Sequence, residues 1–197
     1  MNSRVQPTRA RSERAQEPWT DEAVAQACSS GDSLAVTELF ERFQASVARF
    51  LSRLVTDADV DDLVQITFLQ IARGKARFDG RSAVRTWLFA IATNVMRQHC
   101  RHLARRKRLL WALTSTRHHP PKDRLSEQLE ARRTVQCMQL AFNSLSEKSR
   151  LAFVMCEIEG LTAREAGDVL EATETAIWKR VSDARKVLLK AVASPSA

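Results

Sequence analysis

The strongest constraint on the fold lies near the C-terminal end, where two short helix-forming segments flank a tight turn. Thr162 stands three residues before Glu165, which is the spacing of a capping box that begins a helix. A turn over residues 171–174 then leads into a second amphipathic segment, whose expected inward residues are Ala176, Ile177, Val181, Ala184, Val187 and Leu188. The same segment is expected to present Lys179, Arg180, Arg185 and Lys186 outward. This pattern predicts a helix-turn-helix, a motif that places its second helix in the major groove of DNA.

The composition favours an all-α chain with a polyanionic partner. Only 5 Gly, 5 Pro and no Tyr occur in 197 residues, and the formal net charge is +8. The charge is unevenly spread: residues 21–62 hold nine acidic and three basic side chains, whereas residues 73–108 hold eleven basic ones and a single acid, Asp79. We therefore expect two surfaces with different partners, one of which is nucleic acid.

No metal, cofactor or membrane insertion is expected. The four cysteines are scattered without a CxxC pair, and His99, Cys100 and His102 are poorly spaced to hold one ion from a helix. No apolar run reaches the roughly 18 residues of a membrane span, and no apolar stretch follows the N-terminal arginines as in a secretion signal. These features predict a cytoplasmic protein with inert thiols.

Helical periodicity divides the chain into two parts. Residues 1–19 are polar and rich in arginine, which is typical of a disordered basic arm. Residues 20–112 carry three amphipathic stripes that can enclose one core, and residues 126–191 hold the helix-turn-helix and the helices before it. Residues 113–125 contain two His and two Pro and predict a flexible linker. The expected fold is all-α, with two helical domains joined by that linker.

The second stripe of the first domain belongs to an acidic helix. Its apolar positions between Val60 and Ile71 follow helical spacing, while Asp59, Asp62 and Ile66 fall together on another side. Two interpretations follow from the residues alone. The carboxylates form a solvated face favoured by the positive end of the helix, or they form a surface for a partner.

The next helical segment combines cations with amides. Five residues are expected outside its apolar stripe of Trp87, Leu88 and Ile91, and these are Arg85, Phe89, Asn94, Gln98 and Arg101. Arginines and amides interleaved with an aromatic ring suit single-stranded or distorted DNA, in which bases can be stacked and hydrogen-bonded. The alternative is that the amides stand on the surface by chance.

The motifs together resemble a known family. The pattern DxDDLVQxTF, followed by FDGRSAVRTWLFAIATN and a basic tail, resembles conserved region 2 of bacterial extracytoplasmic-function (ECF) sigma factors. The string LSEKSRLAFVMCEIEGLTAREAGDVL, with the helix after it, resembles their region 4. The resemblance covers about residues 34–108 and 144–190, in the order of the family, with a short linker in place of a region 3.

The resemblance implies three binding surfaces. The acidic helix would dock on the clamp coiled coil of the largest RNA polymerase subunit through Asp59, Asp61, Asp62, Gln65 and Ile66. The basic helix would recognise and hold open the promoter −10 element through Arg85, Phe89, Asn94, Gln98 and Arg101, with both amides toward bases. The second helix of the helix-turn-helix would read the −35 element through Thr173, Trp178, Lys179, Arg180, Ser182 and Arg185, of which the arginines would hold phosphates.

Three residues depart from the family pattern. Ile66 stands where Glu is usual, so an apolar contact would replace a polar contact to polymerase. Glu171 stands in the turn where Gly is usual, and a left-handed backbone there would cost about 1 kcal/mol. Trp178 occupies a position that is more often Lys or Arg, which predicts an unusual promoter preference.

The expected function is that of an alternative sigma factor without catalytic activity. Its implied partners are core RNA polymerase, promoter DNA and an anti-sigma factor that covers both domains. A stand-alone helix-turn-helix regulator is the main alternative, but such a regulator needs neither the acidic helix nor the amide-bearing helix. A metal nuclease would need carboxylates or histidines that converge on a basic cleft, whereas the carboxylates here lie on a separate helix.

Overall fold

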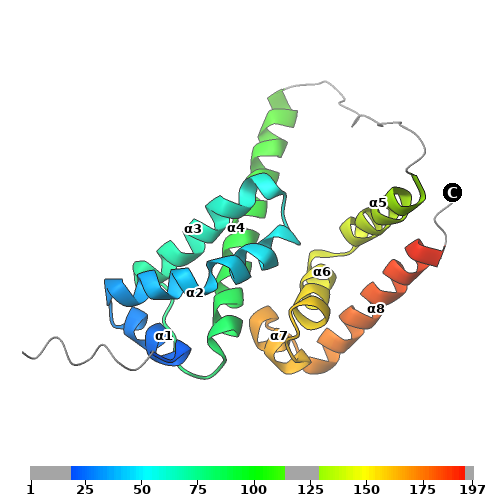
Figure 1. The fold of residues 1–197 in the computed structure, drawn as a ribbon. Coiled ribbons are helices and arrows are strands. Elements are labelled where there is room, and N and C mark those ends of the chain that lie inside the picture. The colour runs from blue at the N-terminus through cyan, green and yellow to red at the C-terminus, as the bar shows by residue number, and fades with distance from the viewer. Residues whose placement is uncertain (1–18, 114–128, 194–197) are drawn as a thin grey trace, which may run out of the picture.

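The computed structural model describes residues 19–113 and 129–193, and within these ranges the chain is helical without strands, as predicted. Figure 1 shows two groups of helices, one from the N-terminal half and one from the C-terminal half, that meet where α7 lies beside α4. Apart from residues 19 and 113, the expected arm (1–19) and linker (113–125) lie outside the described residues.

The N-terminal group contains the helices α1 (Asp21–Ser29), α2 (Ser33–Ser52), α3 (Asp57–Ala72) and α4 (Val84–Leu113). Thr20 and Asp32 begin α1 and α2, because their side chains accept hydrogen bonds from the first free backbone N–H groups of each helix. Arg42 on α2 joins the two helices through an ion pair with Asp21 at 2.9 Å, and it also pairs with Glu38 of its own helix at 2.7 Å. Helix α1 lies before the first amphipathic stripe and was not individually predicted.

The core of this group is built from aromatic rings on three helices. Phe50 of α2 stacks on Phe89 of α4 with ring centroids 4.4 Å apart and planes 14° apart. Phe40 meets Phe68 of α3 edge to face at 5.0 Å. Offset stacked and edge-to-face pairs add about 0.5–1.5 kcal/mol each beyond the area that they bury. These contacts fix α3 and α4 against α2.

The C-terminal group contains α5 (Leu129–Ser144), α6 (Glu147–Phe153), the π-helix η2 (Val154–Ile158), α7 (Ala163–Leu170) and α8 (Glu174–Ala193). The predicted caps are confirmed: Ser146 accepts a hydrogen bond from the N–H of Ser149, and Thr162 forms a complete capping box with Glu165. The prediction that Val187 faces inward is wrong, because 39% of this residue is exposed on α8. The π-helix was not predicted.

The capping box of α7 makes the stability of this domain depend on pH. Hydrogen bonds from the hydroxyl and N–H of Thr162 lower the pKa of Glu165. A carboxyl whose pKa is lower in the folded state stabilises the fold above its unfolded-state pKa, and this stabilisation is lost as the pH falls through the folded-state pKa. We expect Glu165→Ala to cost about 1 kcal/mol near pH 7 and clearly less near pH 3. Urea unfolding followed by circular dichroism at both pH values measures this; an equal cost at both would contradict it.

The turn of the helix-turn-helix contains a left-handed residue, at the position where the family pattern usually has Gly. Glu171 has φ 51° and ψ 51°, and among the described residues it is the non-glycine residue with a positive φ. Its N–H bonds to the carbonyl of Gly167 and closes α7. A side chain in this conformation is strained, whereas glycine adopts it freely.

Glycine at position 171 is therefore expected to stabilise the protein. Glu171→Gly should raise the free energy of unfolding by about 1 kcal/mol, because it removes the strained Cβ. Glu171→Ala is the matched control, since it removes the carboxylate and keeps the Cβ, and it should leave stability nearly unchanged. Thermal unfolding of the three proteins measures the difference. Equal gains from Gly and Ala would assign the effect to the charge instead.

Candidate functional site

The acidic face of α3 is open to solvent. Asp61, Asp62 and Gln65 are exposed, and Ile66 beside them is 40% exposed. The opposite side of the helix is buried through Val60, Leu63, Val64, Thr67, Phe68 and Ile71. The packing of α3 against α2 and α4 therefore leaves this face available for a partner.

Asp59 differs from the other carboxylates of α3 because it is engaged within the domain. The hydroxyl of Thr56 donates to one of its oxygens at 2.5 Å, and the other oxygen lies 3.2 Å from Nε2 of His99 on α4. About a third of its side chain, 31%, is exposed. Asp59 thus lies between the start of α3 and α4 and is less open than the other carboxylates, which the sequence spacing did not reveal.

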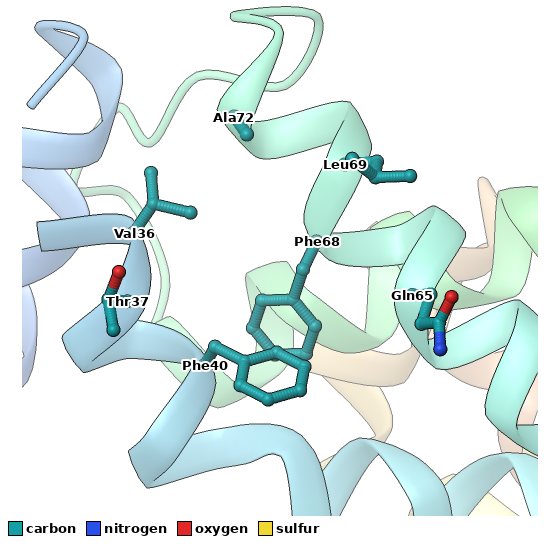
Figure 2. A pocket seen from close by; sticks show the side chains of 7 residues that line it. All are labelled: Val36, Thr37, Phe40, Gln65, Phe68, Leu69 and Ala72. Atoms are coloured by element: carbon teal, nitrogen blue, oxygen red, sulfur yellow. The ribbon is translucent and has the colours of Figure 1, made fainter. Parts of the chain in front are cut away.

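An apolar hollow that the sequence did not predict opens next to the acidic face. It has a volume of about 340 Å³ and lies between α2 and α3 (Figure 2). Its lining residues are Val36, Thr37, Phe40, Gln65, Phe68, Leu69 and Ala72. Helical spacing had placed Phe40 and Phe68 in the core, and only the structure shows that part of these stripes borders an open surface. Gln65 belongs to both the hollow and the acidic face.

Helix α4 presents most of the expected amide-bearing face. Asn94, Gln98 and Arg101 are exposed, while Arg85 is partly covered. Phe89 is a correction: it was expected off the apolar stripe, but it is 0% exposed and stacks on Phe50. Its ring is therefore part of the core and offers no surface to a base in this arrangement. Phe89 and Met96, which are both buried, make the buried side of α4 wider than the predicted stripe.

Arg85 contacts the C-terminal group of helices. Its guanidinium donates to the side-chain carboxylate of Glu159 and, at 2.9 Å, to the backbone carbonyl of the same residue. Arg53, at the end of α2, lies 3.5 Å from the other oxygen of this carboxylate. The guanidinium of Arg85 also stands 5.0 Å from the centre of the Phe89 ring.

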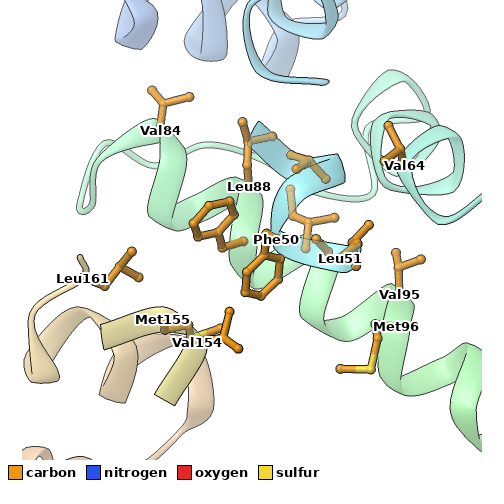
Figure 3. Packing of buried hydrophobic residues seen from close by; sticks show 14 of the residues in the cluster. Phe50, Leu51, Val64, Val84, Leu88, Val95, Met96, Val154, Met155 and Leu161 are labelled. Atoms are coloured by element: carbon orange, nitrogen blue, oxygen red, sulfur yellow. The ribbon is translucent and has the colours of Figure 1, made fainter. Parts of the chain in front are cut away.

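Apolar packing accompanies these ion pairs. Val154, Met155 and Leu161 belong to the same cluster of buried residues as Phe50 and Leu88. Figure 3 shows the labelled side chains of η2 and of Leu161 beside those of α2 and α4. A third ion pair, Arg97 with Glu147 at 3.0 Å, joins α4 to the start of α6. The two groups of helices therefore pack against each other through apolar residues as well as ion pairs.

The outer face of α8 is open. Thr173, Lys179 and Ser182 are exposed, and Trp178 is 54% exposed with its indole N–H 3.4 Å from Glu174. The two arginines of this helix are placed differently. Arg185 forms a two-pronged ion pair with Glu157 of η2 at 2.7 Å, and Arg180 is partly buried. Trp178, Lys179 and Ser182 thus form an accessible face, while Arg185 would have to leave Glu157 to hold a phosphate.

The thiols are suited to a packing role. Burial, with a further contribution from the charge of Asp32, raises the pKa of the Cys28 thiol to about 11. Burial also raises the pKa of Cys100 and Cys156. Because the thiolate is the reactive form, these side chains are poor nucleophiles near neutral pH. In the described ranges, His, Cys, Asp and Glu do not gather in groups of three that could hold a metal ion.

Comparison with known proteins gives matches in both halves of the chain. Residues 39–106 match the family model of Sigma-70 region 2, and residues 135–188 match that of Sigma-70, region 4. The chain is 32% identical to the ECF RNA polymerase sigma factor SigC of Mycobacterium tuberculosis over 85% of this chain and 88% of the relative. It is 28% identical to the ECF RNA polymerase sigma-E factor of Escherichia coli over 87% of this chain and 94% of the relative.

Solved structures show the same fold. The chain is similar to CnrH, solved in complex with the cytosolic domain of CnrY, with a TM-score of 0.63 and 26% identity over 89% of this chain and 99% of the other. It is also similar to the sigma factor RpoE of Bartonella quintana, solved with the anti-sigma factor NepR, with a TM-score of 0.62 and 22% identity over 80% and 96% of the two chains. No helix among the described residues is both long and apolar enough for a membrane span.

Proposed function

This chain belongs to the ECF family of RNA polymerase sigma factors, and we propose that it directs promoter-specific initiation through three separate surfaces. The acidic face of α3 docks on core RNA polymerase, the exposed side of α4 holds the −10 element, and the outer face of α8 reads the −35 element. The observation that carries the proposal is the combination in one chain of an exposed acidic face on α3 with an exposed face on α8.

The docking surface on α3 consists of Asp61, Asp62, Gln65 and Ile66. These residues are exposed together on one side of a helix whose other side is fixed by the core. Asp59 stands at the edge of this surface, where its carboxylate accepts a hydrogen bond from Thr56 and lies 3.2 Å from Nε2 of His99. Ile66 lies beside the apolar hollow at Gln65 and Leu69, so an apolar side chain of the partner would extend the contact there.

The DNA contacts divide between bases and phosphates. Asn94 and Gln98 carry donors and acceptors that suit base edges in an opened −10 region, while Arg85 and Arg101 supply charge for its phosphates. On α8, Trp178, Lys179 and Ser182 face the bases of the −35 element, and Thr173 stands at the start of the helix. Phe89 takes no part in this proposal, since it lies in the core.

The remaining assignments follow from this function. The protein carries no catalytic centre of its own, and it acts in the cytoplasm, where its polymerase partner works. The two domains extend over residues 20–112 and 126–191 and are joined by the linker between them. An anti-sigma factor is a further partner; this is supported by the relative RpoE, which was solved with the anti-sigma factor NepR.

Run-off transcription tests the proposal against a stand-alone regulator. Purified protein with core RNA polymerase should start transcripts from its cognate promoter, and neither component should do so alone. Without core, the protein should bind the promoter duplex weakly. Tight, sequence-specific duplex binding by the protein alone, with no association with core, would overturn the proposal and favour the regulator.

A further inference from the structure

We propose that Glu159 is an internal competitor for promoter DNA, which holds the two halves of the chain closed and occupies Arg85, an arginine that otherwise contacts the −10 strand. The inference rests on the proposed function of α4 and concerns its regulation. It starts from a charged side chain that is almost completely buried between the two domains, with only 6% of the Glu159 side chain exposed.

The two cations within ion-pair distance of Glu159 in the described structure both come from the other domain. Arg85 lies in the first turn of α4 and Arg53 directly follows α2, whereas Glu159 follows η2. A buried carboxylate is costly unless it is paired and hydrogen-bonded, so this burial depends on closure. When the domains separate, both arginines and the carboxylate return to water.

The π-helix explains why Glu159 reaches this position. The wider turn of η2 continues α6, and the N–H of Glu159 bonds to the carbonyl of Val154 at 2.9 Å. π-helical turns are rare and are frequent at functional sites. The same segment places Val154 and Met155, both 0% exposed, in the shared apolar cluster. Apolar packing therefore stabilises the closed form. The position of the Glu159 carboxylate determines which arginines are paired in that form.

A carboxylate and a DNA phosphate bind the same hydrogen-bond donors of an arginine. Both offer anionic oxygens to the planar guanidinium, and both form charge-assisted hydrogen bonds with it. Glu159 uses two guanidinium nitrogens of Arg85, so these donors cannot hold a phosphate at the same time. The side chain of Arg85 remains 41% exposed, so closure occupies this arginine without hiding it.

The closed form is asymmetric with respect to the two promoter elements. On α8, Trp178, Lys179 and Ser182 remain exposed, whereas Arg85 and Arg53 on the other domain are engaged. In the free protein, the −35 face on α8 should therefore be available for DNA, whereas binding of DNA by the −10 face on α4 should be weakened. Separation of the domains would release the second face.

Glu159→Gln tests the competition in the full-length protein. The probe is a fluorescein-labelled, random-sequence single-stranded DNA of about 15 nucleotides, and its binding is followed by fluorescence anisotropy. We expect the affinity to rise about five- to tenfold, because a larger fraction of molecules is open. Amide hydrogen exchange of the first turn of α4 and of η2 should rise in the same variant.

Glu22→Gln is the matched control. It removes the same charge at an exposed position of α1, where the described structure shows no ion pair for Glu22. Any gain that comes only from the altered net charge appears in both variants, so a larger gain for Glu159→Gln isolates the competition. Glu147→Gln breaks the exposed ion pair with Arg97, leaves the core intact, and should shift both measurements in the same direction by a smaller factor.

The outcomes separate this inference from the proposed function. If Glu159→Gln and Glu147→Gln change neither hydrogen exchange nor DNA affinity beyond the control, the inference is overturned, while run-off transcription by the wild type leaves the proposed function intact. If hydrogen exchange rises without a gain in DNA affinity, competition for DNA is also overturned. If both rise but no transcripts form with core polymerase, the competition by Glu159 is supported and the proposed function fails.

Discussion

Arginine in place of Asp62 is expected to weaken binding of core RNA polymerase at least about tenfold. Asp62 is exposed on α3 beside Asp61, on a helix whose opposite side is buried, so the substitution changes the surface without disturbing the core. If the partner surface is basic, reversal of this charge replaces an attraction with a repulsion. Binding of immobilised core polymerase to the full-length protein measures the loss.

Two controls make this result specific. Glu22→Arg makes the same change of charge at an exposed position on α1 and should leave core binding within about twofold of the wild type, because scattered surface charges contribute little. Binding of a −35 duplex should be unchanged in Asp62→Arg, since α8 lies in the other domain. Equal loss of core and duplex binding would indicate misfolding or place the docking surface elsewhere.

Features that depend on local sequence could be predicted. Thr162 and Glu165 form the capping box because both partners lie within one turn, and their spacing alone determines the contact. The left-handed backbone at Glu171 lies where the family pattern usually has Gly, so it was the resemblance, and not local spacing, that drew attention to this position. The apolar stripe of α3 was correct because the helix packs on one side only, which leaves its acidic side exposed.

Features that depend on long-range packing could not be predicted. Phe89 was predicted to lie on the surface because it falls outside the apolar stripe of its own helix. In the fold, the ring of Phe50, thirty-nine positions earlier in the chain, stacks on it. The pairing of Arg85 with Glu159 joins residues 74 positions apart. No helical or turn pattern encodes such a distance, and the π-helical turn that positions Glu159 has no periodic signature in the sequence.

Replacement of Gly167 by alanine is expected to lower the stability of the protein, whereas the same change in an ordinary helix raises it. Replacement of a helical glycine by alanine usually stabilises a helix by about 1 kcal/mol. Here a Cβ on Gly167 would lie 2.6 Å from the backbone carbonyl oxygen of Ala172, in the turn of the helix-turn-helix. A backbone atom in a closed turn cannot move aside as a flexible side chain can. Gly167→Ala should therefore lower the free energy of unfolding by about 2–3 kcal/mol.

The same substitution should weaken −35 binding, because the clash acts on the turn that sets α8 against α7. Asp168→Ala, at the next and exposed position of α7, is the control and should leave stability within about 0.5 kcal/mol of the wild type. Thermal unfolding and −35 duplex binding, measured for both variants, test the two expected effects. A higher melting temperature for Gly167→Ala would mean that the turn can move away from α7, and the close contact between them would then not be what positions the DNA-reading helix.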